Sequence, residues 1–136
     1  PDILSVMKKG EHSSTFGGNP LACAAGTATL HALTQDGLIE NAKSIGEKFS
    51  NGLEELKSKH PIIREIRGKG LMIGVELKFE VKDILMEGIK NGLLLLYSGR
   101  NILRFLPPLV ISEEDTVKTL QILDKLLTNE ENRRNA

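Results

Sequence analysis

Several features that mark large classes of protein are missing from the sequence. Its single cysteine, Cys23, cannot form a disulfide within the chain, which is typical of a protein kept in a reducing cytoplasm. No apolar run approaches the ~20 residues that a transmembrane helix needs. The opening residues, PDILSVMKKG, lack the long apolar centre of a signal peptide. We therefore expect a cytoplasmic protein with no membrane partner.

An excess of charge of either sign is missing as well. Lysine and arginine total 18, aspartate and glutamate total 18, and the net charge is therefore zero. Proteins that bind nucleic acids or membrane surfaces usually carry a basic excess, so this balance argues against both partners. The histidines, His12, His31 and His60, are far apart in the sequence and lack the spacing of metal ligands. We predict no metal site.

The residues that are present follow a helical pattern first and a mixed pattern afterwards. Asn19 is a good N-cap and Pro20 suits the first position of a helix. Apolar spacing and bounding glycines or prolines predict the other elements. Helices are expected over 21–33, 37–58 and 81–91, and a last helix carries the apolar positions from Val117 to Leu127. Strands are expected over 71–77, 93–97 and 102–106, with 93–97 buried. This order predicts an α+β domain in which a short, largely antiparallel sheet has helices packed on one face.

Three shorter patterns predict local structure. Gly68-Lys69-Gly70 predicts a tight turn entering a strand, because no helix follows it as a phosphate loop would require. Ser112 and Asp115 resemble a capping box at the start of the last helix. The polar tail, 129–136, is expected to fray.

The stretch EHSSTFGGNPLACAAG, residues 11–26, combines hydroxyls, glycines and a helix start. A helix N-terminus offers unpaired N–H groups and a partial positive charge. Glycines let backbone N–H groups approach a ligand, and the hydroxyls of Ser13, Ser14 and Thr15 add donors. The combination suits a phosphate or another anion. An ordinary turn before a capped helix explains the same residues, so both interpretations stay open.

Arg104 is a second candidate. In an extended strand Ile102 and Arg104 point to one face, and Leu103 and Phe105 to the other. An arginine between apolar neighbours either forms a structural ion pair, which is the default, or binds a carboxylate with its guanidinium fork. No catalytic triad, Cys-His pair or carboxylate dyad emerges from the spacing.

Three motifs, in order, carry a resemblance to a known family. EHSSTFGGNPLACAAG closely resembles the signature that ends the cofactor-binding domain of class III, pyridoxal-phosphate-dependent aminotransferases. IREIRGKGLMIGVEL is similar to their glycine-punctuated small-domain strand, and NILRFLPPLVISEEDTVKTLQIL to their closing strand and helix. The resemblance runs from about Gly10 to Leu127. It is nearest to acetylornithine and ornithine aminotransferases and to the enzymes that act on carrier-protein-linked lysine or ornithine derivatives. Ser13 departs from the family's usual glycine.

The resemblance implies a cofactor, a dimer and three site residues. The fold would be the C-terminal small domain of a fold type I enzyme, a homodimer with active sites at the interface. Ser14 and Thr15 would bind the phosphate of pyridoxal 5'-phosphate in the neighbouring subunit's site. Arg104 would face the substrate and pair with its carboxylate or with a glutamate of the large domain. The residues Gly17, Gly18 and Asn19 would shape the loop that presents the hydroxyls.

The resemblance also implies that the chain is one part of a longer enzyme, as does its first residue, Pro1. The Schiff-base lysine of relatives lies further upstream than this chain extends. Lys8 and Lys9 are too close to Thr15 to be that lysine. We therefore expect no catalytic residue in this chain and no activity of the chain alone. The expected parts are the end of the cofactor-binding domain (1–19), an interdomain helix with the small domain (20–128) and the tail (129–136).

The resemblance implies one activity and leaves others open. The parent enzyme would move the terminal amino group of an N-acetylornithine-, ornithine- or lysine-like substrate to 2-oxoglutarate, as in arginine or lysine biosynthesis. A non-catalytic interaction module is an alternative. So is another class III reaction, such as that of 4-aminobutyrate aminotransferases or aminomutases.

Overall fold

The computed structural model describes residues 4–8 and 10–135, and Pro1 and Lys9, named above, lie outside them. The chain divides into two compact units, Pro1–Gly37 and Leu38–Ala136, which we call the N-terminal and C-terminal units. No helix in the described part of the chain is long and apolar enough to cross a membrane.

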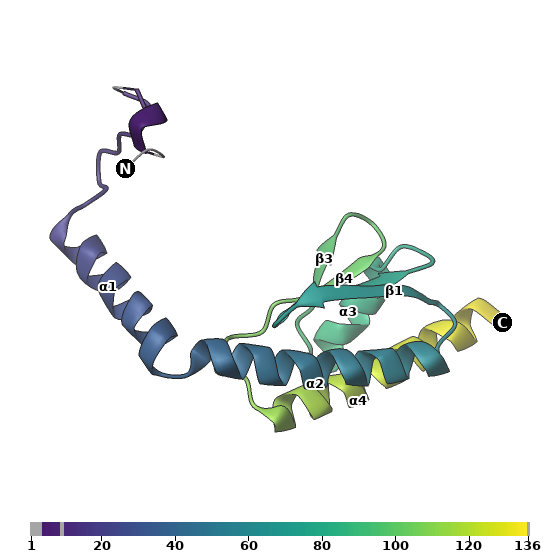
Figure 1. The fold of residues 1–136 in the computed structure, drawn as a ribbon. Coiled ribbons are helices and arrows are strands. Elements are labelled where there is room, and N and C mark those ends of the chain that lie inside the picture. The colour runs from purple at the N-terminus through teal and green to yellow at the C-terminus, as the bar shows by residue number, and fades with distance from the viewer. Residues whose placement is uncertain (1–3, 9, 136) are drawn as a thin grey trace. The chain divides into compact units, whose positions relative to one another are not determined.

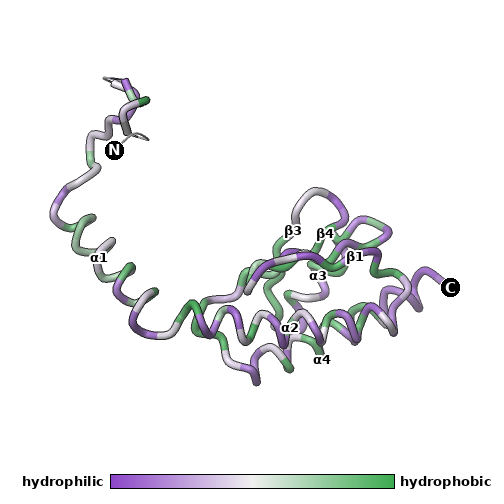
Figure 2. Tube along the Cα trace, viewed as in Figure 1, coloured by the Kyte–Doolittle hydropathy of each residue, from purple (hydrophilic) through white to green (hydrophobic). Residues whose placement is uncertain are grey.

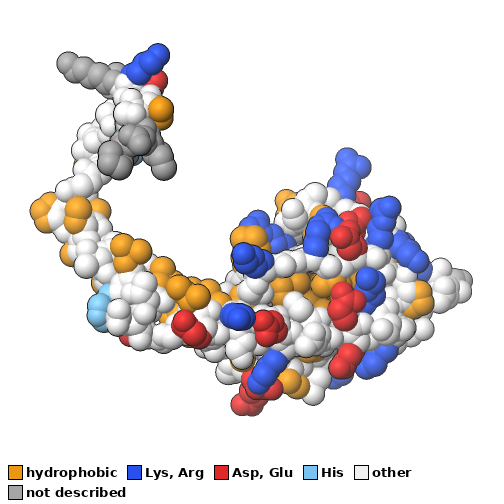
Figure 3. Space-filling model, viewed as in Figure 1, with side chains coloured by type: hydrophobic (Ala, Val, Ile, Leu, Met, Phe, Trp, Pro, Cys, Tyr) orange, Lys and Arg blue, Asp and Glu red, His pale blue; other side chains and the backbone are white. Residues whose placement is uncertain are grey.

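The N-terminal unit contains a 3₁₀ turn, Leu4–Val6, and helix α1, Pro20–Gln35. The start of α1 is as predicted, because Asn19 Oδ1 accepts a hydrogen bond of 3.0 Å from the N–H of Ala22 and Pro20 occupies the first turn. None of its residues is buried, and Leu21 is 80% exposed. Hydrophobic side chains run along the visible face of α1 (Figure 3). The helix therefore has an apolar surface that this unit does not cover.

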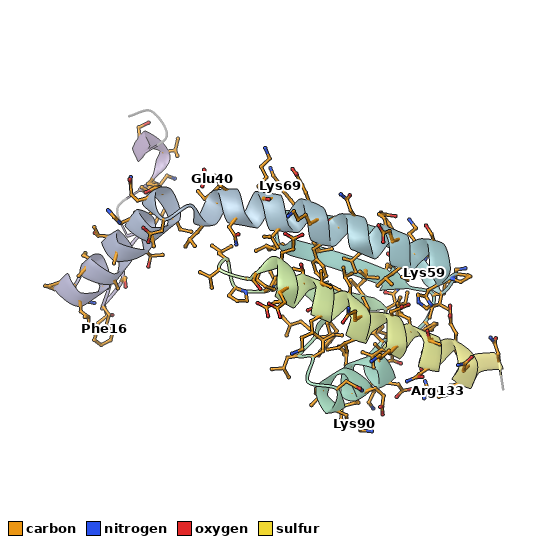
Figure 4. All side chains as sticks on the ribbon, turned by 90° about the horizontal axis from the view of Figure 1, so that it is seen from below. Phe16, Glu40, Lys59, Lys69, Lys90 and Arg133 are labelled. Carbon is orange, nitrogen blue, oxygen red and sulfur yellow. The ribbon has the colours of Figure 1, made fainter. Side chains whose placement is uncertain are left out.

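The C-terminal unit is a four-stranded antiparallel sheet with helices on one face (Figure 1). The strands lie in the order β1-β2-β4-β3, with the bounds β1 Ile63–Lys69, β2 Met72–Leu77, β4 Ile102–Phe105 and β3 Leu96–Ser98. The helices are α2 Leu38–Lys59, α3 Lys82–Lys90 and α4 Glu113–Asn135. Seen from below, α2 and α4 lie side by side, with α3 beside α4 (Figure 4). This architecture confirms the predicted α+β fold.

The core lies between the sheet and the helices. Alternate strand residues face the helices, so each strand contributes every second side chain. The largest fully buried side chains are those of Phe49, Leu53, Ile73, Leu77, Ile84, Leu103, Leu123 and Leu127, with Val75 and Val81. The rings of Phe49 and Phe105 meet edge to face, with centroids 5.2 Å apart. Hydrophobic segments accordingly gather between the two layers (Figure 2). Each buried side chain of this size contributes about 1.5–3 kcal/mol.

The predicted turn is found at Gly70 and Leu71, which join β1 to β2, whereas Gly68 and Lys69 belong to β1 itself. The turn also contacts α2. Gly70 has a φ of +56°, a conformation that glycine adopts without strain. Gly46 of α2 lies against it, and a Cβ on Gly46 would lie 2.4 Å from the Gly70 carbonyl oxygen. The backbone of α2 therefore packs directly on the turn.

One strand was not predicted, and the prediction of a buried strand over 93–97 was wrong. Residues 63–69 form β1, which was not expected as a strand, because its charged residues hide the apolar alternation. The segment 93–97 is not a buried strand, since β3 covers Leu96–Ser98 and all three residues are exposed. Leu94 is 83% exposed and Tyr97 67%. β3 lies at the edge of the sheet, where apolar side chains can stay exposed. Its apolar composition therefore did not indicate that it is buried.

The expectation of a frayed tail was also wrong, because α4 continues to Asn135. Buried Glu130 accepts hydrogen bonds from Arg133 Nη2 at 2.9 Å and from Arg134 Nε at 2.6 Å. The Arg134 guanidinium lies over the ring of Phe79, 3.5 Å from its centroid. These contacts hold the polar end of the helix on the domain.

A buried polar cluster joins the C-terminal ends of α2 and α4. His60, which follows α2, is 5% exposed. Its Nε2 lies 2.7 Å from Asp124 Oδ1 and its Nδ1 lies 2.9 Å from Glu131 Oε2. Lys48, in the middle of α2, pairs with Glu113, the first residue of α4. The two helices therefore run in the same direction and are joined at two places along their length.

Candidate functional site

The loop before α1 is closed by its own side chains. Ser14 Oγ accepts a hydrogen bond of 2.8 Å from the N–H of Gly17, and Asn19 Nδ2 donates to the Phe16 carbonyl at 2.6 Å. A Cβ on Gly17 would lie 2.9 Å from Ser14 Oγ, so glycine allows this contact. Gly18 has a φ of +72°, the left-handed region that favours glycine. The glycines of the motif thus fix a turn that leads into the helix.

The hydroxyls of this loop remain available to a ligand. The Ser14 oxygen is an acceptor for Gly17, which leaves its proton free to donate elsewhere. The side chain of Thr15 is exposed, and within residues 4–8 and 10–135 no hydrogen-bond partner meets its hydroxyl. Ser14 and Thr15 precede Leu21, which carries the first N–H group of α1, by seven and six residues. The arrangement offers donors to an anion.

Arg104 lies on the face of the sheet that no helix covers. Its neighbours Leu103 and Phe105 are buried and Arg104 itself is half-buried, which confirms the predicted alternation of β4. Across the strands its register partners are Gly74 of β2 and Leu96 of β3. A hollow of about 330 Å³ lies beside it, lined by Arg67, Gly68, Met72, Ile73, Gly74, Ser98 and Ile102 as well as Arg104.

An ion-pair network beside Arg104 was missed in the sequence. Glu76 Oε2 accepts from Arg67 Nη1 at 2.9 Å, while Glu76 Oε1 accepts from Arg64 Nη1 at 3.2 Å and from Asn101 Nδ2 at 3.3 Å. Arg67 Nη1 also donates to Glu65 Oε2 at 2.6 Å. The bond from Arg67 is the main cause of the lowered pKa of Glu76, and the same bond raises the pKa of Arg67. The network depends on the pairing of β1 with β2 in the register Glu65↔Glu76 and Arg67↔Gly74, which the sequence did not reveal.

Arg104 differs from these arginines because it has no ionic partner among the residues that the structure describes. No carboxylate within the described part of the chain forms a hydrogen bond or ion pair with its guanidinium. An unpaired, half-buried guanidinium can bind a carboxylate through two parallel hydrogen bonds. Ser14 and Thr15 belong to the N-terminal unit and Arg104 to the C-terminal unit, so the structure describes them as two separate groups. Among the residues it describes, no cluster of histidine, cysteine or carboxylate side chains could hold a metal ion.

Comparison with known proteins gives a consistent result. The family model described as "Aminotransferase class-III" matches residues 1–127. The acetylornithine aminotransferase of Caldanaerobacter subterraneus subsp. tengcongensis is 49% identical over 125 residues, which are 91% of this chain and 32% of the relative. The chain thus spans about a third of the length of the curated relatives that it matches.

Solved structures agree with this match. The acetylornithine aminotransferase of Elizabethkingia anophelis superposes with a TM-score of 0.85 at 36% identity, over 94% of this chain and 33% of that one. An ornithine aminotransferase from Toxoplasma gondii, crystallised in the presence of oxidised glutathione, gives a TM-score of 0.89 at 36% identity, over 100% of this chain and 33% of that one. That structure has partial occupancy of PLP at the protein active site.

Proposed function

Because the chain belongs to the class-III aminotransferase family, we propose that it is the C-terminal part of a pyridoxal-phosphate-dependent aminotransferase. The enzyme moves the terminal amino group of an N-acetylornithine-, ornithine- or lysine-like substrate to 2-oxoglutarate, in the cytoplasm, as a step of arginine or lysine biosynthesis. The names of its relatives, acetylornithine and ornithine aminotransferase, support this substrate class. The lysine that carries the cofactor belongs, in this proposal, to the part of the protein that precedes the chain.

The observation that carries the proposal is the unpaired charge of Arg104. Arg64 and Arg67 of β1 are both bonded to Glu76, whereas Arg104 has no carboxylate partner among the described residues. A partly buried charge is costly unless it is paired, so its partner is expected to come from outside the described chain. A substrate carboxylate satisfies this requirement, and we assign it to Arg104.

The loop before α1 fits the phosphate of the cofactor. Pyridoxal phosphate, when bound, supplies the electron sink for amino-group transfer, and the protein supplies binding and orientation. Ser14 keeps a proton to donate because its oxygen already accepts from Gly17. Thr15 is exposed, and the positive end of α1 favours a dianion nearby. These residues would bind the phosphate and orient the ring.

The proposed enzyme is a homodimer in which Ser14 and Thr15 contact the cofactor of the neighbouring subunit. The exposed apolar side chains of α1 support a covered position for this helix in the complete protein, since Leu21 is 80% and Leu30 is 64% exposed here. In this dimer the hydroxyls that contact the cofactor phosphate and the lysine that carries the cofactor come from different subunits.

The experiment is an Arg104→Ala exchange in the full-length protein. Truncating one member of a desolvated charge pair costs about 2–5 kcal/mol. We therefore expect kcat/KM to fall at least about 30-fold while the absorbance of the bound cofactor is retained. Arg100→Ala, an exposed arginine of the preceding turn, is the matched control and should keep full activity.

Two outcomes would contradict the proposal. Unchanged kinetics with reduced thermal stability would mean that Arg104 pairs with a glutamate of the large domain. A full-length protein with no transaminase activity towards any of these substrates would instead support the non-catalytic module.

A further inference from the structure

We infer that Gly74 leaves open the space in which a substrate carboxylate, carried on an unbranched aliphatic chain, contacts Arg104. This inference rests on the proposed function, because it assumes that Arg104 binds substrate. The inference adds Gly74, which has no side chain, to the proposed substrate site, and it defines the shape of the acid that fits beside Arg104.

Gly74 occupies the middle of a row of residues across the sheet. Its register partners are Arg67 on β1 and Arg104 on β4. The neighbouring residues of β2, Ile73 and Val75, are buried, so the missing side chain of Gly74 belongs to the outer face. Neighbouring strands lie ~4.8 Å apart, which places the Cα atoms of the two arginines roughly 10 Å from each other. The glycine therefore leaves a gap between two guanidinium groups.

The two arginines are not equivalent. Arg67 is bonded to Glu65 at 2.6 Å and to Glu76 at 2.9 Å, so its charge is already balanced. Glu76 is also held by Arg64 and Asn101, which fixes its position. Arg104 is the guanidinium of this row that has no carboxylate partner in the described residues. An incoming carboxylate is therefore expected to bind at Arg104.

The rest of the hollow is suited to methylene groups. Met72 is 55% exposed on the outer face, and half-buried Ile102 follows on β4. Both line the same hollow of about 330 Å³ as Gly74 and Arg104. This volume is close to the lower limit for small-ligand pockets. Of the two guanidinium groups that line the hollow, only that of Arg104 lacks a carboxylate partner among the described residues. Together with two apolar side chains it matches an acid whose carboxylate ends a short, unbranched chain.

A single methyl group at position 74 tests this geometry. The Gly74 backbone is that of a β-strand outside the left-handed region, so alanine is compatible with it. An added Cβ would lie 3.3 Å from Ile102 Cγ2 and 3.8 Å from the Arg67 carbonyl oxygen, with open space elsewhere. The chain should therefore fold with a small adjustment of Ile102, and the methyl group would project into the hollow.

The experiment compares Gly74→Ala with the wild type in the full-length protein. We expect the KM for 2-oxoglutarate to rise about ten-fold or more, with kcat, the cofactor absorbance and the Tm little changed. Glutarate, an unreactive dicarboxylate, is the binding probe, and its Kd by calorimetry should rise by the same factor. Gly74→Ala/Ile102→Leu removes the Cγ2 methyl of Ile102 that the new Cβ would meet but keeps the methyl group at position 74, so both constants should stay raised.

The outcomes separate this inference from the proposed function. If Arg104→Ala impairs the enzyme but Gly74→Ala leaves KM and the glutarate Kd unchanged, the role of Gly74 is wrong and the proposed function stands. Full recovery in the double variant would mean that the alanine acts by displacing β4, which also overturns the inference. If neither Arg104→Ala nor Gly74→Ala has an effect, both proposals fail.

Discussion

Exchange of the buried histidine at the end of α2 should destabilise the C-terminal unit strongly. In His60→Leu the side-chain volume is nearly kept, but both nitrogen atoms that face Asp124 and Glu131 are lost. Carboxylates accept hydrogen bonds and cannot donate them when charged, so neither can replace the lost donor. The other oxygen of Glu131, Oε1, is buried and already lacks a partner among the described residues.

The expected loss follows from the exposure of the two carboxylates. The Glu131 side chain is 22% exposed, and a hydrogen bond to such a charged group contributes about 1.5–3 kcal/mol. The Asp124 side chain is 41% exposed, so solvent screens its pair and about 0.2–1 kcal/mol is the appropriate range. Together these give a decrease of roughly 2–4 kcal/mol in the free energy of unfolding. This is a large part of the 5–15 kcal/mol of an ordinary domain.

Urea denaturation of the chain measures this decrease. With an m-value of about 2 kcal/mol/M, the midpoint should fall by roughly 1–2 M without a change in m. His31→Leu, at an exposed histidine of α1, is the control and should not move the midpoint. Adding Glu131→Leu to His60→Leu should restore part of the loss, because it removes the unpaired carboxylate. A midpoint shift no larger than that of the control would refute the reasoning.

Two further predictions concern the starts of α1 and α4. In the full-length protein, Thr15→Val should weaken binding of pyridoxal phosphate about ten-fold or more, because a hydrogen bond to a charged group contributes about 1.5–3 kcal/mol. Titration of the apoprotein measures this; Thr15→Ser should bind normally, and wild-type affinity of the valine variant would exclude the contact. Ser112→Ala removes an N-cap, in which Ser112 Oγ accepts from the N–H of Asp115 at 3.1 Å, so stability at pH 7 should fall by about 1 kcal/mol. The Ser112 hydroxyl also donates to Asp115 Oδ2 at 2.7 Å, and this second bond is the main cause that lowers the pKa of Asp115 below its ordinary 3.8. The contribution of the second bond is therefore complete above pH 3.8 and is lost as the pH falls through the lowered value. Denaturation at pH 7 and at pH 3 should therefore show a smaller difference between variant and wild type at pH 3, and an equal difference would contradict the assignment.

Local signals in the sequence predicted local structure well. The Ser112–Asp115 capping box is confirmed in both directions, since Ser112 N donates to Asp115 Oδ2 at 3.3 Å and Asp115 N donates to Ser112 Oγ. The Asn19 cap and the alternation around Arg104 are confirmed for the same reason. Each depends on residues within a few positions of one another, where sequence spacing and spatial distance agree.

Features that depend on distant residues could not be read in this way. His60 contacts partners that lie 64 and 71 residues away. The charges of β1 become part of a network only when β2 pairs with it and brings Glu76 beside Arg67. The polar end of α4 stays helical because Phe79, from another part of the chain, lies under Arg134. The roles of Ser14, Thr15 and Arg104 remain predictions, since they require groups outside the chain.

The strand order β1-β2-β4-β3 has a consequence for aggregation. It makes β1 and β3 the two strands with unpaired backbone groups, and such edges are where sheets of different molecules join into fibrils. β1 carries exposed charges at Arg64, Glu65, Arg67 and Lys69, and β3 is three residues long. Charge on one edge and shortness of the other both oppose strand addition. Association of this chain at high concentration should therefore proceed through side-chain surfaces and leave no amyloid-type signal with thioflavin dyes.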